Sequence, residues 1–275
     1  MRAFRVWVAV LAAAAAAAAP ARAQPAPNPV TFAPVSGQPG KDVVWVPTQQ
    51  GLVDRMLDMA GATPSDYVVD LGSGDGRTVI TAAGRGIRAL GIEYNPDMVM
   101  VSRQAADQAG VAERARFVEG DIFATDFSDA TVLTMFLLPN LNVRLRPTIL
   151  SMKPGTRVVS NTFDMGDWTP DQTIDAGNEC MSFCRAHKWI VPAKVGGVWR
   201  LPDAELKLTQ RYQTVTGLLS TGGKEVPITD GRLNGAAISF EAGGQRYTGT
   251  VTGTRLEAKA GNGPAQTWTG TLDGS

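Results

Sequence analysis

The sequence predicts an α/β protein in which a mainly parallel sheet carries helices on both faces and is followed by a small C-terminal antiparallel β meander. Strand-like apolar runs alternate with helical periodicity from residue 42 to residue 201, and a glycine-rich turn links the first strand to its helix. Beyond Pro202, short alternating runs are separated by glycines. We therefore expect one α/β domain over 42–201 and a small β-rich domain, a meander or an open barrel, over 202–275.

The amino-terminal residues 1–23 have the pattern of a secretory signal peptide. Two arginines precede a short apolar run, 6–19, which leads to an A-x-A site before Gln24. The run is too short to span a bilayer comfortably. We therefore expect cleavage after Ala23 and an exported protein in the periplasm, with a proline-rich linker over 24–41. No membrane span is expected after removal of the leader.

The charge balance argues against nucleic acid as the main partner. The chain has 26 basic and 26 acidic residues. Residues 1–23 hold three arginines and no acid, so 23 basic and 26 acidic residues remain, a net charge of −3. Binding to phosphates requires an excess of lysine and arginine on the contacting surface. A single histidine, His187, gives no convincing Ser/His/Asp triad, and no cluster of ligands predicts a metal site.

The first strand is predicted over 67–71, where apolar β-branched residues suit a strand buried on both faces. Residues 70–76 then read D-x-G-x-G-x-G, and alternate glycines let the backbone turn tightly and approach a ligand. The helix that follows offers free N–H groups and the positive end of its dipole to that ligand. The third glycine comes one residue too early for a dinucleotide fingerprint, and the phosphate-loop motif is absent.

Two later carboxylates are predicted at the ends of the next two strands. Glu93 ends the second strand, 23 positions after Asp70, and a carboxylate there can accept hydrogen bonds from both hydroxyls of a ribose. Asp121 ends the third strand-like run, which begins at Phe117. The carboxyl ends of parallel strands form the ligand-binding edge of such a sheet. We therefore expect both carboxylates and the glycine turn to converge on one pocket.

This ordered set resembles the class I, seven-strand S-adenosylmethionine-dependent methyltransferases, whose first motif reads D-x-G-x-G-x-G. The resemblance implies a Rossmann-like methyltransferase sheet and S-adenosylmethionine as the cofactor. It also implies that Asp121 binds the adenine amino group and that Ile122 lies against the ring. The cofactor-binding residues implied in this way are Thr48, Asp70, Gly72, Ser73, Gly74, Gly76, Glu93, Tyr94, Asp121, Ile122 and Phe136.

Four motifs are similar to those of the small seven-strand protein-lysine methyltransferases: Val46-Pro47, 70–77, 91–96 and 153–155. This resemblance covers residues 43–165 and implies methylation of a protein lysine. Residues 137–140 lack the Asp/Asn-Pro-Pro-aromatic run of enzymes that methylate amines of nucleic acids. Two alternatives stay open: a small-molecule methyltransferase, and an exported binding protein with a non-catalytic methyltransferase fold, because the cofactor is made in the cytosol.

The other elements follow from periodicity and order along the chain. A helix is predicted over 50–60, because its apolar positions share one face. The segment 46–48 before it either packs on the sheet or closes over the methionine end of the cofactor. The later elements predicted are a helix over 95–109, a strand over 130–136, a helix over 141–152, a strand over 155–161, and two final antiparallel strands of the sheet over 188–192 and 195–201.

The resemblance places the methyl acceptor beside the carboxyl ends of the fourth and fifth strands, near 136–140 and 161–164. The sulfonium is already activated, so the protein has to align a lone pair with the methyl group and exclude water. A lysine acceptor must also lose its proton, which a dry, apolar pocket favours. The catalytic residues are not fixed by the sequence, and the candidates for orienting an amine are Tyr94, Asn140, Asn161 and Asp164.

Cys180 and Cys184 are the only cysteines. In an exported protein such a pair favours a disulfide, with two buried thiols as the alternative. Four residues along a strand separate the Cα atoms by about 13 Å, whereas one helical turn brings them to about 6 Å. A disulfide therefore requires the segment between the two cysteines to turn back on itself.

Overall fold

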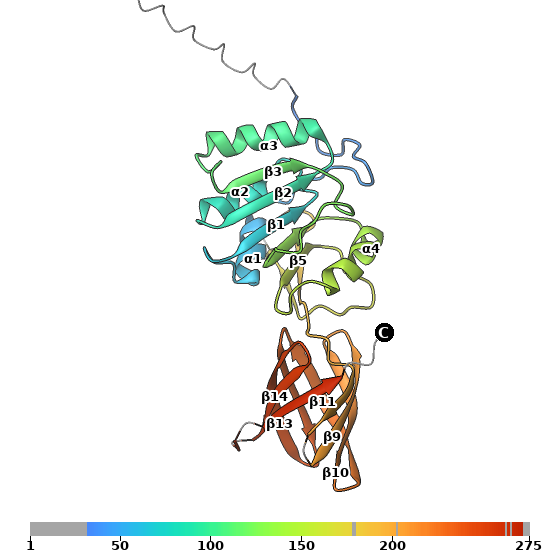
Figure 1. The fold of residues 1–275 in the computed structure, drawn as a ribbon. Helices are drawn as coiled ribbons and strands as arrows, with labels where there is room; N and C mark the ends of the chain where they lie inside the picture. Colours follow the sequence, from blue (N-terminus) through green and yellow to red (C-terminus); the bar gives the residue numbers. More distant parts are fainter. Residues whose placement is uncertain (1–31, 178–179, 202, 262, 265, 272–275) are drawn as a thin grey trace, which may run out of the picture. The chain divides into compact units, whose positions relative to one another are not determined.

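The computed structural model describes residues 32–177, 180–201, 203–261, 263–264 and 266–271. The predicted signal peptide, 1–23, lies outside the described residues, as does the first part of the predicted linker. The described chain begins with an irregular segment, 32–49, and continues through an α/β domain into an antiparallel barrel (Figure 1).

The α/β domain is built on a seven-stranded sheet with the strand order β3-β2-β1-β4-β5-β7-β6. The first five strands along the chain are parallel, and β7 pairs antiparallel with both β5 and β6. The strands are β1 (Tyr67–Leu71), β2 (Arg88–Glu93), β3 (Ala115–Glu119), β4 (Val132–Met135), β5 (Arg157–Asn161), β6 (Gln172–Asp175) and β7 (Arg185–Ile190). Because the strand order reverses direction between β1 and β4, the switch point lies at the carboxyl ends of these two strands.

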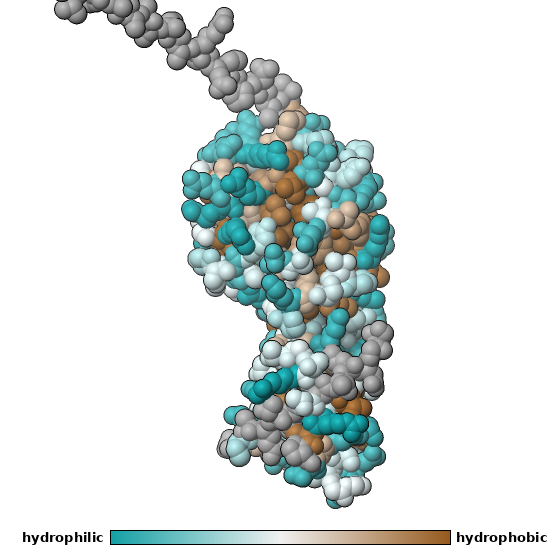
Figure 2. Space-filling view, in the orientation of Figure 1, coloured by the Kyte–Doolittle hydropathy of each residue, from teal (hydrophilic) through white to brown (hydrophobic). Residues whose placement is uncertain are grey.

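Helices cover both faces of the sheet, so the predicted fold class is confirmed. The helices are α1 (Gln50–Ala60), α2 (Arg77–Gly84), α3 (Pro96–Gln108) and α4 (Pro139–Leu150). Alternate residues of a strand enter two separate cores: in β1, Val68 packs in the core that holds α1, α2 and α3, and Val69 packs in the core that holds α4. On the face of this domain seen in Figure 2, apolar residues form a band among hydrophilic ones. None of the described helices is long and apolar enough to cross a bilayer.

The last two strands of the sheet were predicted only in part. The strand predicted over 188–192 is confirmed, shifted towards the amino terminus, as β7. The strand predicted over 195–201 is wrong for this sheet, because β8 (Gly197–Arg200) pairs with barrel strands and Trp199 is fully buried in the barrel core. The edge of the sheet is formed instead by β6, whose largely exposed, polar residues give no apolar alternation to detect.

The C-terminal strands form a closed antiparallel barrel rather than an open one. After β8, the strands are β9 (Ala204–Arg211), β10 (Thr214–Thr221), β11 (Lys224–Asn234), β12 (Ala237–Ala242), β13 (Gln245–Thr252), β14 (Arg255–Ala260) and β15 (Gln266–Thr271). Consecutive strands pair as in the predicted meander, and β15 pairs with β8 to close the barrel. Closure removes the two unpaired edges that an open meander would leave.

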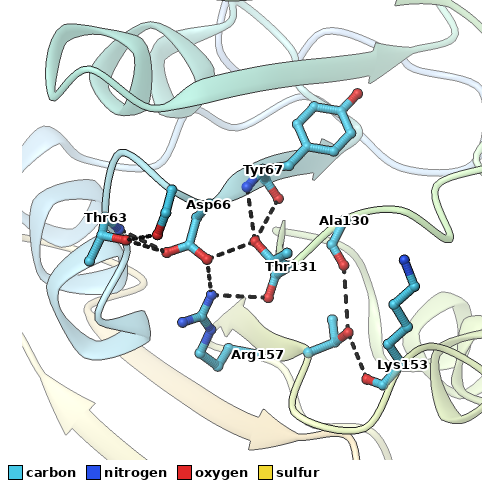
Figure 3. Close-up of polar contacts among 9 residues, drawn as sticks. Thr63, Asp66, Tyr67, Ala130, Thr131, Lys153 and Arg157 are labelled. Carbon is cyan, nitrogen blue, oxygen red and sulfur yellow. Dashed lines mark hydrogen bonds and ion pairs between the residues drawn. The ribbon is translucent and has the colours of Figure 1, made fainter.

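A polar network fixes the amino-terminal ends of the central strands (Figure 3). The Asp66 carboxylate accepts hydrogen bonds from the Thr63 N–H at 2.9 Å and from the Thr131 hydroxyl at 2.8 Å, and it forms an ion pair with Arg157. The Thr131 hydroxyl also accepts a hydrogen bond from the Tyr67 N–H at 2.9 Å. One carboxylate therefore ties the starts of β1, β4 and β5 together, opposite the edge where ligands bind.

Cys180 and Cys184 form a disulfide, and their Cα atoms are 5.4 Å apart. The segment between them bends without forming a regular element, and Phe183 within it has a positive φ of 55°. The chain therefore turns back on itself as a disulfide requires, and the alternative of two free thiols is wrong.

Candidate active site

An open cleft lies at the carboxyl ends of β1, β2, β3 and β4. Its walls come from the loops that follow these strands and from the amino-terminal segment 38–48. The cleft is lined by every cofactor-binding residue implied by the sequence except Gly76. Residues separated by up to 88 positions, from Thr48 to Phe136, therefore surround one space at the switch point of the sheet.

The glycine turn between β1 and α2 brings bare backbone to the cleft. Gly74 has a φ of +53°, and a Cβ atom there would lie 2.3 Å from the Trp45 indole nitrogen, so no larger residue fits without a shift. Gly76, outside the cleft lining, is the N-cap of α2 with a φ of +81°. A Cβ atom on Gly76 would lie 2.7 Å from the Phe117 ring. Gly74 therefore permits close approach within the cleft, whereas Gly76 permits close packing of α2 on β3.

Glu93 is the last residue of β2 and lines the cleft. One of its carboxylate oxygens accepts a hydrogen bond from the Gly74 N–H at 2.9 Å, and the other accepts one from the Asn95 N–H at 2.9 Å. Each oxygen has a further lone pair to offer to a ligand. The two backbone donors hold the carboxylate in one orientation, so it is set in advance for a ligand with neighbouring hydroxyl groups.

Asp121 carries a contact that the sequence did not predict. One carboxylate oxygen accepts a hydrogen bond from the Phe123 N–H at 2.9 Å, and the other accepts one from the Lys41 ammonium at 2.7 Å. Lys41 Nζ also lies 4.5 Å from the centroid of the Tyr94 ring. The hydrogen bond to Lys41 lowers the pKa of Asp121 and raises that of Lys41. A ligand amino group that binds Asp121 must share it with Lys41 or displace it.

Asp70 is almost fully buried at the base of the cleft. The Thr134 hydroxyl of β4 donates a hydrogen bond to it at 2.6 Å. The pKa of Asp70 is raised to about 7, chiefly by burial and also by the charges of Glu93 and Asp75, while hydrogen bonds from Thr134 and Thr78 oppose the shift. The sequence pointed to Asp70 but gave no signal for Thr134, which reaches the site only through the pairing of β1 with β4.

The residues fit the cofactor that the sequence resemblance implies. Ser73 lines the cleft, and its buried hydroxyl has no hydrogen-bond partner within the described part of the chain. A buried polar atom without a partner is energetically costly, and a ligand in the cleft can supply the missing partner for this hydroxyl. Ile122 and Met98 add apolar wall, and Glu93 offers its remaining lone pairs. Bare backbone, fixed carboxylates and an apolar wall match the amino-acid, ribose and adenine parts of S-adenosylmethionine.

Of the four candidates for orienting an amine, only Tyr94 lines this cleft, and its side chain is half exposed. Asn140 is exposed at the start of α4, and Asp164 is exposed and accepts a hydrogen bond from the Gly166 N–H at 3.0 Å. Asn161 is fully buried and donates to the Thr48 hydroxyl at 3.1 Å. Asn161 therefore acts as a positioning residue for Thr48.

Asn142 of α4 was not predicted from the sequence. It is fully buried, and its amide donates to the carbonyl oxygens of Phe163 at 3.2 Å and Asp164 at 3.0 Å. These bonds fix the loop that follows β5 on the α4 side of the site. A polar residue within an apolar helical pattern was the only signal in the sequence that pointed to it.

A second, smaller cleft adjoins the first. It is lined by apolar side chains from the amino-terminal segment, from the end of β4, from the loop after β5 and from the disulfide loop. These residues, called the apolar cleft below, are Val43, Val44, Val46, Phe136, Leu137, Leu138, Phe163 and Phe183. Five of them also line the cofactor cleft: Val43, Val44, Val46, Phe136 and Leu137. The two clefts therefore adjoin at the end of β4, where these residues line both of them.

Comparisons with known proteins agree with this geometry. Residues 70–172 match the family model described as the ANTKMT methyltransferase domain. A protein-lysine N-methyltransferase of Saccharolobus islandicus is 44% identical over 135 residues, which are 48% of this chain and 84% of the relative. The adenine nucleotide translocase lysine N-methyltransferase of Mus musculus is 32% identical over 139 residues, 50% of this chain and 60% of that protein. The chain thus spans little more than half the length of the mouse relative.

A solved structure is similar as well. The crystal structure of an RNA methyltransferase from Salinibacter ruber in complex with S-adenosyl-L-homocysteine has 45% sequence identity and a TM-score of 0.51, and it covers 55% of this chain and 96% of that chain. The sheet order, the cleft at the switch point and these similarities agree on the reaction class and on S-adenosylmethionine as the cofactor. The chain belongs to the protein-lysine N-methyltransferase family within the seven-strand S-adenosylmethionine-dependent methyltransferases.

Proposed function

We propose that the protein transfers a methyl group to the side-chain amine of a lysine in another protein. The observation that carries this proposal is the apolar cleft, which adjoins the cofactor cleft and shares Phe136 and Leu137 with it. No charged side chain lines it among the residues that the structure describes. An apolar lining suits the alkyl chain of lysine, and the names of the curated relatives support the same acceptor.

The bound cofactor supplies a methyl group on a positively charged sulfur, and the protein supplies position and dryness. The apolar cleft removes water from the entering amine, which lowers the pKa of the amine and favours its neutral form. The proton passes to solvent as the amine enters the cleft. Phe136 and Leu137 line both clefts, so they are placed to restrict the line of approach of the nitrogen lone pair. Tyr94 lines the cofactor cleft but not the apolar cleft, and its ring lies beside Lys41, so its position does not support a role in orienting the amine.

An RNA acceptor is the alternative to compare, because the similar structure from Salinibacter ruber carries that name. An RNA-binding surface needs lysine and arginine to neutralise phosphates. The apolar cleft has neither among its described residues, and residues 24–275 carry a net charge of −3, from 23 basic and 26 acidic residues. The protein acceptor is therefore favoured, and the same experiment can distinguish the two.

The test is transfer of labelled methyl groups from S-adenosylmethionine to fractionated cell extract. We expect label that is lost on protease treatment, survives ribonuclease and is recovered as methyllysine after hydrolysis. Asp70→Ala should abolish transfer, whereas Glu119→Gln, an exposed carboxylate beside Glu93 on the next strand, should retain it. Label that is lost on ribonuclease treatment would overturn the proposal. Cofactor binding without transfer to any fraction would support the non-catalytic alternative.

We also propose that the protein works outside the cytosol. The Cys180–Cys184 disulfide supports this placement, because disulfides persist in oxidising compartments. Cell fractionation and sequencing of the mature amino terminus provide the test. We expect the protein in the periplasmic fraction, beginning at Gln24. A cytosolic protein that retains Met1 and has two free thiols would contradict the proposal.

A further inference from the structure

Three phenylalanines from distant parts of the chain meet in the apolar cleft. Phe136 follows β4, Phe163 follows β5 and Phe183 lies in the disulfide loop. The Phe136 ring lies 5.3 Å from that of Phe183 and 6.0 Å from that of Phe163, measured between centroids, and the third pair is 6.3 Å apart. All three rings therefore contact one another and line one cleft, and Phe136 also lines the adjoining cofactor cleft.

The outer side of this cleft leaves large apolar side chains in contact with solvent. Val44 is 55% exposed, Phe183 is 43% exposed and Leu138 is 39% exposed. Each of them lines the apolar cleft. A cluster of exposed apolar side chains marks a surface that binds a partner. Because five residues line both this cleft and the cofactor cleft, we take that partner to be the methyl acceptor rather than a second copy of the chain.

Phe183 is held in place by more than its own packing. The disulfide closes the loop on both sides of it, and the Cys184 carbonyl accepts a hydrogen bond from the Ala176 N–H at 2.8 Å. Gln49, the N-cap of α1, accepts a hydrogen bond from the Met181 N–H at 3.0 Å. Phe183 itself has a φ of +55°, which a bulky residue adopts only when its surroundings impose it. The loop therefore fixes the ring at the mouth of the cleft.

We propose that Phe183, held by the Cys180–Cys184 loop, is a specificity-determining residue that selects a lysine flanked by apolar side chains in the acceptor protein. The inference rests on the proposed function. A polar neighbour of the lysine would lose its water at this mouth, and no described residue lining the apolar cleft has a polar side chain to replace it. An apolar neighbour would instead bury its surface against Phe183, Val44 and Leu138.

The experiment compares two synthetic peptides of equal length, each with one central lysine, flanked by alanine and leucine in one and by serine and glutamate in the other. The mature protein is assayed for kcat/KM with each peptide. The peptide Kd is measured separately by fluorescence anisotropy on protein saturated with S-adenosylhomocysteine. We expect the apolar peptide to be preferred by about tenfold or more in both measurements, because one unmatched polar group accounts for about that factor.

Substitutions then assign the preference to the ring. Phe183→Ala should reduce kcat/KM for the apolar peptide by about tenfold and leave the Kd for S-adenosylhomocysteine within twofold. Phe183→Leu should retain most of the activity. Met181→Ala is the matched control, because its side chain lies in the same loop, is 93% exposed and does not line the cleft. The double variant Cys180→Ser with Cys184→Ser keeps the Phe183 ring but removes the disulfide that holds its loop. Its loss of kcat/KM for the apolar peptide should be smaller than that of Phe183→Ala.

The outcomes separate the two proposals. Equal or better use of the polar peptide, or full activity of Phe183→Ala on the apolar one, would overturn the role of Phe183. If neither peptide is methylated while the cofactor binds, the proposed lysine activity fails. The anisotropy measurement still decides the inference in that case: preferential binding of the apolar peptide that Phe183→Ala weakens would support it, and equal binding of both peptides would reject it.

Discussion

Replacing the buried carboxylate by its neutral amide, Asp70→Asn, should stabilise the cofactor-free protein at alkaline pH. Burial raises the pKa of Asp70 from 3.8 to about 7 in the folded state. The folded protein therefore keeps a proton that the unfolded chain has lost, so the free energy of unfolding falls as pH rises from about 4 to about 7 and is level above that. This loss of stability between about pH 4 and pH 7 amounts to about 4 kcal/mol, and the neutral asparagine side chain does not incur it.

Urea unfolding of the cofactor-free protein at pH 5, 6, 7 and 8 measures this difference. The free energy of unfolding of Asp70→Asn relative to the parent protein should rise from pH 5 to pH 8, where the difference should approach its full value of about 4 kcal/mol. Asp129→Asn serves as the control, because that side chain is 84% exposed. Asp70→Asn should also bind the cofactor less tightly than the parent protein, since Asp70 lines the cleft. Parallel pH profiles for Asp70→Asn and the parent protein would refute the assignment of a buried, destabilising carboxylate.

Two further substitutions test contacts at opposite ends of the sheet. Lys41→Met should tighten cofactor binding a few-fold, because Asp121 would no longer have to give up its hydrogen bond with Lys41 to bind the cofactor. Calorimetric titration measures this change. Weaker binding would mean that Lys41 itself contacts the cofactor. Asp66→Asn should lower the free energy of unfolding at pH 7 by about 2 kcal/mol, because charged hydrogen bonds to three residues are lost. Burial raises the pKa of Asp66, but these hydrogen bonds lower it more, so the net pKa lies below 3.8. The contribution of Asp66 to the free energy of unfolding is therefore present above pH 3.8 and lost as pH falls below that value. An equal loss of stability in Asp66→Asn at pH 7 and at pH 2.5, measured by urea unfolding, would contradict this.

The parts of the site that local patterns determine were predictable. The glycine turn, Glu93 and Asp121 each follow a strand-like run, and parallel strands bring their carboxyl ends to the same edge. The order of strands and carboxylates along the chain was therefore enough to predict that these residues lie close together, although it gives no distances. The structure places all three in one cleft.

The parts that depend on long-range contacts were not predictable. Lys41 lies in a proline-rich segment with no periodicity, and only the fold brings it to Asp121, 80 positions later. Asn161 was a candidate because it ends β5, but its side chain turns to Thr48 instead. Phe183 gave no signal at all, since the disulfide loop has neither helical nor strand periodicity. Side-chain direction at the end of a strand is decided by packing, which one sequence does not encode in a local pattern.

The most direct test of the shared cofactor cleft is calorimetric titration with S-adenosylhomocysteine of the mature protein and two matched variants. Glu93→Gln removes the carboxylate that the Gly74 and Asn95 N–H groups hold in the cleft, and Glu119→Gln removes its exposed neighbour on β3. We expect a micromolar Kd for the parent protein, at least a tenfold weaker one for Glu93→Gln, and a change within twofold for Glu119→Gln. Absence of binding by the parent protein, or equal Kd values for all three proteins, would contradict the account.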